Sequence, residues 1–514
     1  MRWLRMLLWI ILVLAVLWVA GRWIFPVPAT AGRAIQTAIP FDPDTRLGPR
    51  AVEAQAAHPG KSGVMPLAEG PDALHSRIAL AKHAERSLDV MYYIWHDDVS
   101  GLLLLDALRA AAARGVRVRL LLDDNGVAGM DTILAAMNAQ PNFEVRLFNP
   151  STVRNPKMLG YALYPLRMNR RMHNKAFIVD GAAAIVGGRN IGDEYFDVGD
   201  KPSYLDLDVL GVGKVVTDTA AIFDEYWNSE PVLKLDQVIA GGGDMTGFDA
   251  ALAQATASGA GQRYLADARS AADQLAAGGA PALEWTDVQV VADDPRKGMD
   301  YVPRTQLMIN RLVEILGPVA SRMDLISAYF VPAKAGTKYF GNLARQGVEL
   351  RILTNSWEAT DVPLVHAGYT KYRRELLQAG AHLYELKRSG DRPQGKEELG
   401  PIGSSGASLH AKTFVVDDRR VFIGSFNFDP RSALLNCEMG FLIDSPTMAR
   451  HSTLMFTEAL IPRSYQPELQ DEAMVWLDPQ PDGSTAVIEY EPGLRPGSRI
   501  MVYALNLLPI EWLL

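Results

Sequence analysis

The chain contains one stretch of about twenty residues that occurs, in its essentials, twice. Residues 171–190 read RMHNKAFIVDGAAAIVGGRN, and residues 409–427 read LHAKTFVVDDRRVFIGSFN. In both copies a histidine is followed by lysine at +2, aspartate at +7, glycine at +14 and asparagine at +17. Apart from the glycines, the shared positions are His173, Lys175, Asp180 and Asn190, and His410, Lys412, Asp417 and Asn427. Such a match indicates two copies of one functional unit.

The residue types in this repeat suit chemistry on a phosphate group. A short apolar run follows each histidine and predicts a buried strand. The histidine and the lysine lie on or just before that strand, and because residues two apart point the same way, both side chains face one cavity. Histidine acts as nucleophile or general acid and base near neutral pH, and the lysine beside it supplies positive charge. Asparagine after a tight glycine turn donates amide N–H groups to phosphate oxygens. The aspartates end their strands, where holding local backbone or the lysine competes with a catalytic role.

The flanking sequence is duplicated as well. A strand, a helix and a strand are predicted in the same order twice, over residues 87–95, 101–114 and 116–122 and over residues 323–330, 337–346 and 348–353. The displacement is 235 residues between Trp95 and Phe330 and 237 between the histidines. A nearly constant displacement indicates two copies of one α/β domain. Because each copy carries one histidine, we expect the copies to face each other about a pseudo-twofold axis, with the site at their seam.

The spacing resembles the His-x-Lys-x4-Asp-x6-Gly-(Gly/Ser)-x-Asn motif of the phospholipase D superfamily. The resemblance implies two duplicated α/β/α domains with mixed central sheets, and a two-step phosphodiester reaction with no metal or other cofactor. In that reaction His173 attacks phosphorus to give a phosphohistidine, while His410 protonates the leaving oxygen and then activates the acceptor. The reverse assignment of the two histidines stays open. Lysine and asparagine of both copies would hold the phosphate oxygens. Ser425, which stands where the first copy has Gly188, is also expected to bind substrate.

Acidic residues downstream of each copy resemble those that orient the histidines in this family. Asp206 follows the first copy and Glu438 the second, and we place both in that role. Asp208 is the competing choice for the first copy, and an ordinary surface carboxylate is the alternative for each. Which carboxylate serves which histidine is not decided by the sequence.

Charged residues near the first copy suggest two further readings. Arg167, Arg170 and Arg171 precede the histidine and offer guanidinium groups to phosphate, and a solvated turn is the alternative. We expect Arg171 to bind substrate. Asp123 and Asp124 invite a metal site, but no His or further carboxylate accompanies them at ligand spacing, so we expect no metal.

Several stretches resemble the bacterial cardiolipin synthase branch of the superfamily. They are residues 355–361, 365–369, 427–432 and 508–514. The resemblance implies a phosphatidyltransferase that forms cardiolipin from phospholipids, with phosphatidylglycerol as the expected substrate. The alternatives are a phospholipase D hydrolase that releases phosphatidic acid and a nuclease. The net charge of −8 weighs against binding of nucleic acid, and no protein partner is inferred.

The N-terminus carries a hydrophobic segment. Residues 6–20 are uniformly apolar and would span roughly 22 Å as a helix, against about 30 Å for a hydrocarbon core. Flanking tryptophans and arginines extend the segment at the interface, so we expect an uncleaved anchor in a bacterial inner membrane. Arg2 and Arg5 favour a cytoplasmic N-terminus and a periplasmic catalytic part. A signal peptide cleaved after residues 29–31 is the alternative, and it would give a secreted or periplasmic protein.

The expected domain organisation has five parts in 514 residues. They are a membrane anchor or signal segment at 1–33, a linker at 34–70, a first phospholipase D-like domain at 71–235, an Ala/Gly-rich connector at 236–281 and a second such domain at 282–514. The single cysteine, Cys437, cannot form an intrachain disulfide and is assigned to core packing.

Overall fold

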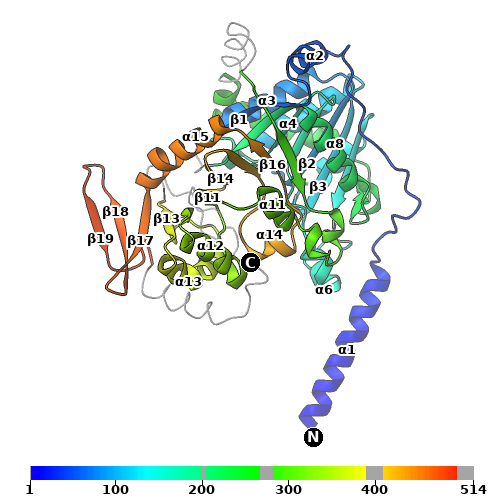
Figure 1. Ribbon diagram of the computed structural model, residues 1–514. Helices are drawn as coiled ribbons and strands as arrows, with labels where there is room; N and C mark the ends of the chain where they lie inside the picture. Colours follow the sequence, from blue (N-terminus) through cyan, green and yellow to red (C-terminus); the bar gives the residue numbers. More distant parts are fainter. Residues whose placement is uncertain (1, 200–202, 267–281, 389–408, 495–514) are drawn as a thin grey trace.

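The computed structural model describes residues 2–199, 203–266, 282–388 and 409–494. Two mixed β-sheets with helices packed on them form the body, and one long helix projects from it (Figure 1). The expected α/β fold with two duplicated domains and an N-terminal hydrophobic helix is confirmed.

The first sheet has nine strands in the order β8-β4-β3-β2-β5-β6-β7-β1-β9. Their bounds are β1 Ser62–Leu67, β2 Ser87–Ile94, β3 Arg117–Gly126, β4 Phe143–Phe148, β5 Ala176–Val179, β6 Ala183–Gly187, β7 Asp208–Gly213, β8 Val232–Lys234 and β9 Glu284–Thr286. Its helices are α2 Gly48–Ala57, α3 Gly70–His83, α4 Val99–Ala113, α5 Asp131–Asn138, α6 Leu159–Leu163, α7 Pro165–Met168, α8 Lys214–Trp227 and α9 Met245–Ala257. Strands β2, β3 and β4 are parallel, and the other pairs are antiparallel.

The second sheet has ten strands in the order β10-β16-β15-β14-β11-β12-β13-β17-β18-β19. Their bounds are β10 Val288–Ala292, β11 Arg322–Ser327, β12 Glu349–Asn355, β13 His382–Leu386, β14 Lys412–Val416, β15 Arg420–Gly424, β16 Met439–Asp444, β17 Ser464–Gln470, β18 Ala473–Pro479 and β19 Thr485–Ile488. Its helices are α11 Met308–Leu316, α12 Ala333–Arg345, α13 Pro363–Gln378, α14 Pro430–Leu434 and α15 Pro446–Leu454. Strands β11, β12 and β13 are parallel.

The two sheets repeat the same local design. In each, a parallel pair is joined by a helix, and the strand after the histidine pairs antiparallel with the first of that pair. Even a buried ion pair recurs at equivalent positions, with Arg119 binding Asp89 in the first sheet and Arg351 binding Asp324 in the second. The strand, helix and strand predicted in each half are all present, with ends that differ by a few residues.

A shared hydrophobic core joins the two halves. It combines side chains of β5, β6, β7 and α8 with side chains of β14, β15 and β16 from the other half. Phe441 of β16 is fully buried there, and a Cβ built on Gly211 of β7 would lie only 3.3 Å from the Phe441 ring. The seam between the halves is therefore packed like a domain interior rather than like a transient contact.

The sheets do not follow the expected domain boundaries. Strand β1 lies in the residues assigned to a linker, yet it pairs along its whole length with β7. Strand β9 lies in the residues assigned to the second domain, yet it pairs with β1 in the first sheet. In the expected connector, α9 packs on α4 and α5 and places Phe248 in the first core, while residues 267–281 lie outside the described part. Apolar pairing across the edge strands overrides the loop-like composition of these stretches.

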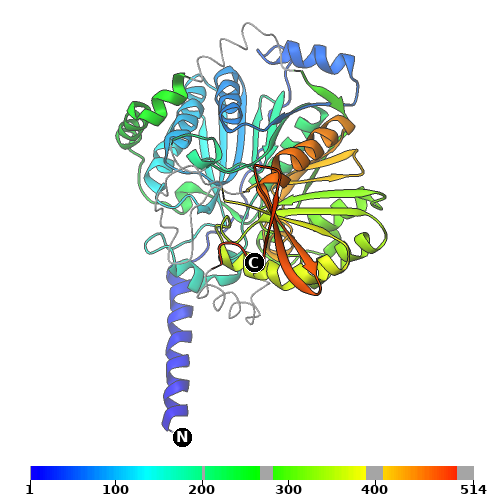
Figure 2. The same ribbon diagram turned by 90° about the vertical axis from the view of Figure 1, so that its left-hand side faces the viewer.

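Helix α1 (Arg2–Ile24) extends away from the body (Figure 2). Its 23 residues correspond to about 34 Å of helix, and none of them is buried in the protein. Within the described residues it is the single helix that is long and apolar enough to cross a membrane. The structural helix is longer than the apolar run at 6–20 because the flanking tryptophans and arginines continue it.

The shared core predicts that stability is coupled across the seam. Phe441→Ala is expected to lower the free energy of unfolding by about 3 to 5 kcal/mol, because it leaves a cavity between the halves. Limited proteolysis should then cut both halves faster. Phe340→Ala, which empties a site in the second half's own core, is the matched control and should leave the first half as resistant as before. Unchanged resistance of the first half in Phe441→Ala would contradict a shared core.

Candidate active site

The two histidines lie just before equivalent strands, and each is held by a carboxylate from the opposite half. His173 precedes β5, and its Nδ1 lies 2.8 Å from Oε2 of Glu438. His410 precedes β14, and its Nδ1 lies 2.5 Å from Oδ2 of Asp206. With Nδ1 of each ring held by a carboxylate, Nε2 is the nitrogen left for other chemistry.

Backbone hydrogen bonds lock this exchange in place. The His173 N–H donates to the Cys437 carbonyl at 2.8 Å, and the Cys437 N–H donates to the Arg171 carbonyl at the same distance. On the other side the His410 and Ala411 N–H groups both donate to the Leu205 carbonyl at 2.9 Å. The segments that precede the histidines thus pair directly with the segments that carry the opposite carboxylates.

The lysines and asparagines of the repeat surround the histidines. Lys175 and Lys412 are both almost completely buried, and each ammonium group donates to the carbonyl of the histidine two residues before it. The Asn190 carbonyl accepts from the Ile94 N–H and its amide donates to the Tyr195 hydroxyl. Asn427 accepts from the backbone N–H at the equivalent end of β11. Both asparagines are therefore held in fixed orientations at the ends of central strands.

Aromatic rings enclose the imidazoles. The Tyr93 ring stands edge-on to His173 with centroids 4.9 Å apart. Tyr195 and Tyr204 flank His410 at 5.1 and 5.2 Å. His173 and His410 are only 7% and 8% exposed, so the reacting groups lie in a largely dry environment where charges interact strongly.

Burial sets the charge state of the histidines and their carboxylates. It lowers the pKa of His173 to about 4, against the opposing carboxylate of Glu438, and that of His410 to about 3 with help from Lys412. Burial opposes ionisation of Asp206, but His410 outweighs it and holds the pKa of that carboxyl below its usual range. At neutral pH each pair is thus a neutral imidazole beside an ionised carboxylate.

The lysine charges are weakly held. Burial lowers the pKa of Lys175 to about 7, against the opposing charge of Glu438, and the nearby ammonium of Lys412 adds to the effect. Burial likewise lowers the pKa of Lys412 to about 8. Burial is the main cause in both cases, since nearby carboxylates such as Glu438 and Asp206 act in the opposite direction. An anionic phosphodiester bound beside the lysines would favour their protonated forms further.

Asp180 and Asp417 are not near the histidines, contrary to their place among the expected catalytic residues. Asp180 follows β5 at the end opposite His173, and its carboxylate accepts from the backbone N–H groups of residues 85, 86 and 87. Asp417 does the same for residues 320, 321 and 322. Both adopt a positive φ, of 50° and 53°, in the turn after the strand. Each carboxylate thus binds the turn to the start of the adjacent strand, which is β2 for Asp180 and β11 for Asp417.

Arg171 and Ser425 contact protein groups rather than an open site. The Arg171 guanidinium donates to Oδ1 of Asp123 and to backbone carbonyls, and the residue is 3% exposed. The Ser425 hydroxyl donates to Oε2 of Glu438 at 2.5 Å, and its carbonyl lies 3.1 Å from Nδ1 of His173. These intramolecular contacts give no support to the expected binding of substrate by Arg171, which stays a prediction. Ser425 instead steadies the carboxylate that orients His173.

The neighbouring charged residues are also engaged within the fold. Arg170 donates to the carbonyls of Lys297 and Asp300, so the arginine cluster does not line an open surface as expected. Asp124 binds Arg154, and the Asp123 carboxylate also accepts from the Met172 N–H. Asp208, the competing choice for orienting a histidine, binds Arg77 at 2.8 Å.

Two features of the site were missed by sequence reasoning. Gly188 leaves room for the orienting carboxylate, because a Cβ there would lie 2.1 Å from Oδ1 of Asp206. Its counterpart Ser425 instead bonds to the longer Glu438. Tyr195, which packs on His410, lies five residues after Asn190, and no spacing rule marked it. The Gly/Ser difference was the available signal for the first feature.

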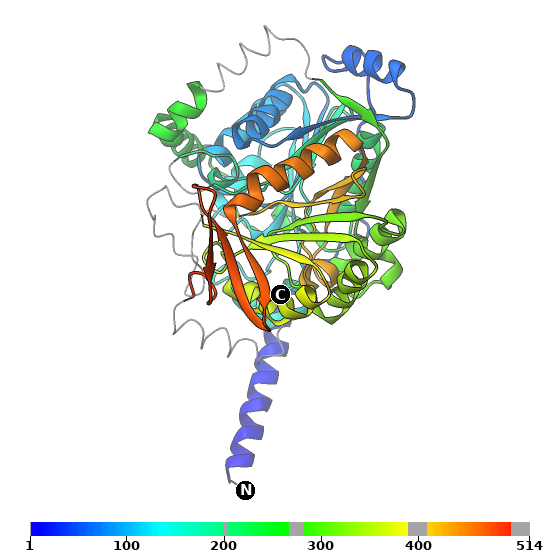
Figure 3. The ribbon, with the colours of Figure 1, turned by 60° about the vertical axis from the view of Figure 1, so that its left-hand side comes forward.

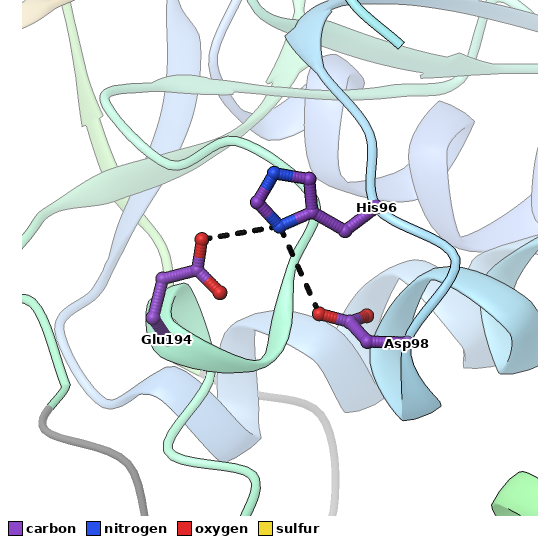
Figure 4. Close-up of side chains that lie close together, drawn as sticks. All are labelled: His96, Asp98 and Glu194. Carbon is purple, nitrogen blue, oxygen red and sulfur yellow. Dashed lines mark ion pairs between the residues drawn. The ribbon is translucent and has the colours of Figure 1, made fainter. Parts of the chain in front are cut away.

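A second group of titratable side chains lies near the site. His96 follows β2, with Nδ1 3.2 Å from Oε1 of Glu194 and 3.9 Å from Oδ2 of Asp98 (Figure 4). Burial, together with Asp193, raises the pKa of Asp98 to about 7. Asp98 also accepts from the Gly101 and Asp193 N–H groups, so it caps α4 and fixes the turn that carries Tyr195.

Comparison with known proteins places the chain in a family. The family model for the cardiolipin synthase PLD-like domain matches residues 77–227 and 312–460. Cardiolipin synthase C of Escherichia coli strain K12 is 45% identical over 473 residues, which is 91% of this chain and 100% of that protein. The chain belongs to the cardiolipin synthase family with PLD-like domains. The resemblance drawn from the repeat is thereby confirmed, and the two matched ranges correspond to its two copies.

More distant relatives share the architecture. A cardiolipin synthase of Listeria monocytogenes serotype 4a is 26% identical over 413 residues, covering 80% of this chain and 71% of that protein. The crystal structure of phosphatidylserine synthase from Haemophilus influenzae Rd KW20 superposes with a TM-score of 0.57 at 14% identity, over 90% of this chain and all of the other. That superposition shows the shared fold.

The turn carboxylates predict a separation of stability from chemistry. Asp180→Ala is expected to lower the free energy of unfolding by about 2 to 4 kcal/mol, because it removes the acceptor of three backbone N–H groups, of which that of Ser87 is buried. Turnover per folded molecule should change by less than about threefold, since the carboxylate touches no reacting group. Asp417→Ala, whose amide partners at residues 320 and 321 are exposed, should cost less stability. A large loss of turnover without loss of stability would restore a catalytic role to Asp180.

The lysine environment predicts a pH dependence. Turnover is expected to fall as the pH rises through about 7 to 8, because Lys175 and Lys412 lose the charge that attracts the phosphodiester. A lysine with a folded pKa below its unfolded value binds fewer protons in the folded state, so thermal stability should rise from about pH 7, the folded pKa of Lys175, to about pH 10.4, the ordinary lysine pKa. Lys175→Met should weaken both trends. Turnover that stays unchanged up to about pH 10.4, the ordinary lysine pKa, would contradict the lowered pKa values.

Proposed function

We propose that this chain is a membrane-anchored phosphatidyltransferase that forms cardiolipin through a phosphohistidine intermediate. The observation that carries the proposal is the exchange of carboxylates across the seam, which brings both histidines into one site with their Nε2 atoms available. The names of the relatives, cardiolipin synthases from two bacteria, support the product.

In the first step Nε2 of His173 attacks phosphorus, and the bond from phosphorus to the leaving alcohol oxygen breaks. His410 gives its Nε2 proton to that oxygen, so the alcohol leaves neutral and the phosphatidyl group stays on His173. The bound phosphodiester is an anion, and its charge favours the protonated form of His410 that the empty site disfavours. Asp206 stabilises that imidazolium through Nδ1.

In the second step the now neutral His410 takes a proton from an acceptor hydroxyl. The hydroxyl oxygen attacks phosphorus, the bond from phosphorus to Nε2 of His173 breaks, and the lipid product leaves. With the glycerol hydroxyl of phosphatidylglycerol as acceptor, the product is cardiolipin, and with water it is phosphatidic acid. Lys175 and Lys412 balance the charge on the phosphoryl oxygens in both steps, and Asn190 and Asn427 direct amide groups toward them.

The described contacts favour His173 as the nucleophile. Its carboxylate, Glu438, also accepts from the Ser425 hydroxyl, whereas Asp206 accepts from the Leu207 N–H and makes the shorter contact with its histidine. The closer carboxylate suits the acid role of His410 only once the substrate anion is bound, because burial and Lys412 otherwise hold the pKa of His410 at about 3, below the value of about 4 for His173. The assignment of the two roles is therefore part of the proposal and is decided by the ring on which the phosphoryl adduct is trapped.

The proposal places the catalytic body on the outer side of the inner membrane. Helix α1 is the anchor, and Arg2 and Arg5 at its start keep that end in the cytoplasm. The body follows α1 and so lies on the periplasmic side, where the phospholipid surface is within reach.

Substitution of either histidine tests the reaction. His173→Ala and His410→Ala are each expected to lower turnover by roughly 10⁴-fold or more, because the two rings act as a unit. Labelled phosphatidylglycerol in vesicles, with product identification by mass spectrometry, measures this and should show cardiolipin as the main product of the unaltered protein.

A matched control separates chemistry from folding. His451→Ala alters an exposed histidine on α15 and should keep full turnover. A phosphoryl adduct trapped on His410 rather than His173 would reverse the roles. Phosphatidic acid as the main product, or near-normal turnover in either active-site variant, would reject the proposal.

A further inference from the structure

A stretch beside α1 has no role in the proposed reaction. Residues 158–166 read MLGYALYPL, nine residues without a charge in a chain that is 21% charged. Within it Met158, Leu159 and Leu166 are 72%, 49% and 75% exposed. We call residues 158–166 the α6–α7 segment. Exposed apolar side chains gathered in one uncharged segment mark a contact surface.

The α6–α7 segment lies against the end of α1. The Trp18 indole N–H donates to the Ala162 carbonyl at 3.1 Å, and the Tyr164 hydroxyl donates to the Phe25 carbonyl at 2.9 Å. The Leu163 side chain fills the space beside Gly21, within 2.7 Å of where a Cβ would stand. These contacts run over about the last two turns of α1, and Figure 1 shows α6 at this junction.

This position fixes the depth of the segment. Helix α1 is about 34 Å long, and a hydrocarbon core of about 30 Å ends within its last turns if its other edge lies near Arg2 and Arg5. Trp18 stands six residues, or about 9 Å, before the end of the helix, and Ala162 is bound at that level. The α6–α7 segment therefore lies at the membrane interface rather than above it.

The side chains at the junction are those of an interface. The Arg22 guanidinium lies 4.7 Å from the Trp18 ring and 4.8 Å from the Tyr164 ring. Trp23 is 83% exposed beside them. Tryptophan, tyrosine and arginine gather where headgroups meet acyl chains, because their rings are apolar and their polar atoms reach water.

We propose that the α6–α7 segment inserts into the outer leaflet interface of the bilayer that holds α1, as a second membrane contact of the body. Its apolar side chains reach the acyl boundary, and Lys157 and Arg167 bound the segment at either end. The occupant of this surface is the lipid bilayer itself, argued from its continuity with the membrane-crossing helix.

The segment also reaches toward the active site, which extends the proposed function and rests on it. The Tyr161 hydroxyl donates to Oδ1 of Asn125 at 2.8 Å. Asn125 also forms a hydrogen bond with Tyr93, whose ring stands against His173. One side chain, Asn125, thus connects the interface residue Tyr161 with the Tyr93 ring that faces His173, so lipid contact at the segment sets the height of the site above the bilayer.

Fluorescence labelling of the full chain tests the membrane contact. In vesicles that contain phosphatidylglycerol, an environment-sensitive dye on Leu166→Cys should emit at shorter wavelength than in water and should be quenched several-fold more by spin-labelled lipid than the same dye on Val52→Cys. Val52 is an exposed apolar residue on α2, at the end of the molecule opposite α1 (Figure 3). Cys437 does not compete for the dye, because it is fully buried and burial raises its pKa to about 12.

A second arm measures turnover. Leu166→Asp is expected to lower turnover of phosphatidylglycerol in vesicles by about tenfold and to leave turnover of a monomeric short-chain phosphatidylglycerol unchanged, with Val52→Asp as the control. A Leu166 dye quenched no more than the Val52 dye would overturn the inference, including the case in which another protein surface shields it. Failure of the proposed function would remove both activities while the labelling result still stood.

Discussion

Each of the two imidazoles at the seam depends on a carboxylate that the other half provides. Glu438 fixes His173 and Asp206 fixes His410, and the backbone pairing of residues 172 and 205 with residues 437 and 409 makes the exchange rigid. The packed seam around Phe441 is what permits such an arrangement, because a mobile interface would leave buried charges without partners. The site therefore keeps its geometry only while the seam stays packed.

Burial has opposite effects on the groups of the site. It keeps the imidazoles neutral and lowers the pKa of Lys175, and a bound phosphodiester anion would favour the protonated lysine again. Each carboxylate is also buried in direct contact with its ring. Asp206 can therefore stabilise a protonated His410 once the anion is bound. The free energy that the fold loses by burying cations is returned when substrate binds.

Local patterns in the sequence were sufficient for the fold class, the repeat and the histidines, because each depends on spacing within one strand and turn. Contacts between residues far apart in the sequence were harder to predict. Glu438 lies 265 residues from His173, and only the resemblance suggested its role. Arg171 was predicted to bind substrate because it precedes a histidine, but its guanidinium donates to Asp123, 48 residues earlier. The edge strand β1 was taken for a linker because its partner β7 comes nearly 150 residues later.

The exchange of carboxylates arranges the two halves of this chain like the subunits of a symmetric dimer, in which each subunit supplies a residue to the other's site. Covalent fusion removes the requirement that both subunits be identical. Gly188 beside Asp206 and Ser425 beside Glu438 show what that freedom allows, since one ring has a short direct carboxylate and the other a longer one steadied by a hydroxyl. A strictly symmetric ancestor would have to use one ring for two opposite tasks, whereas this chain can specialise each.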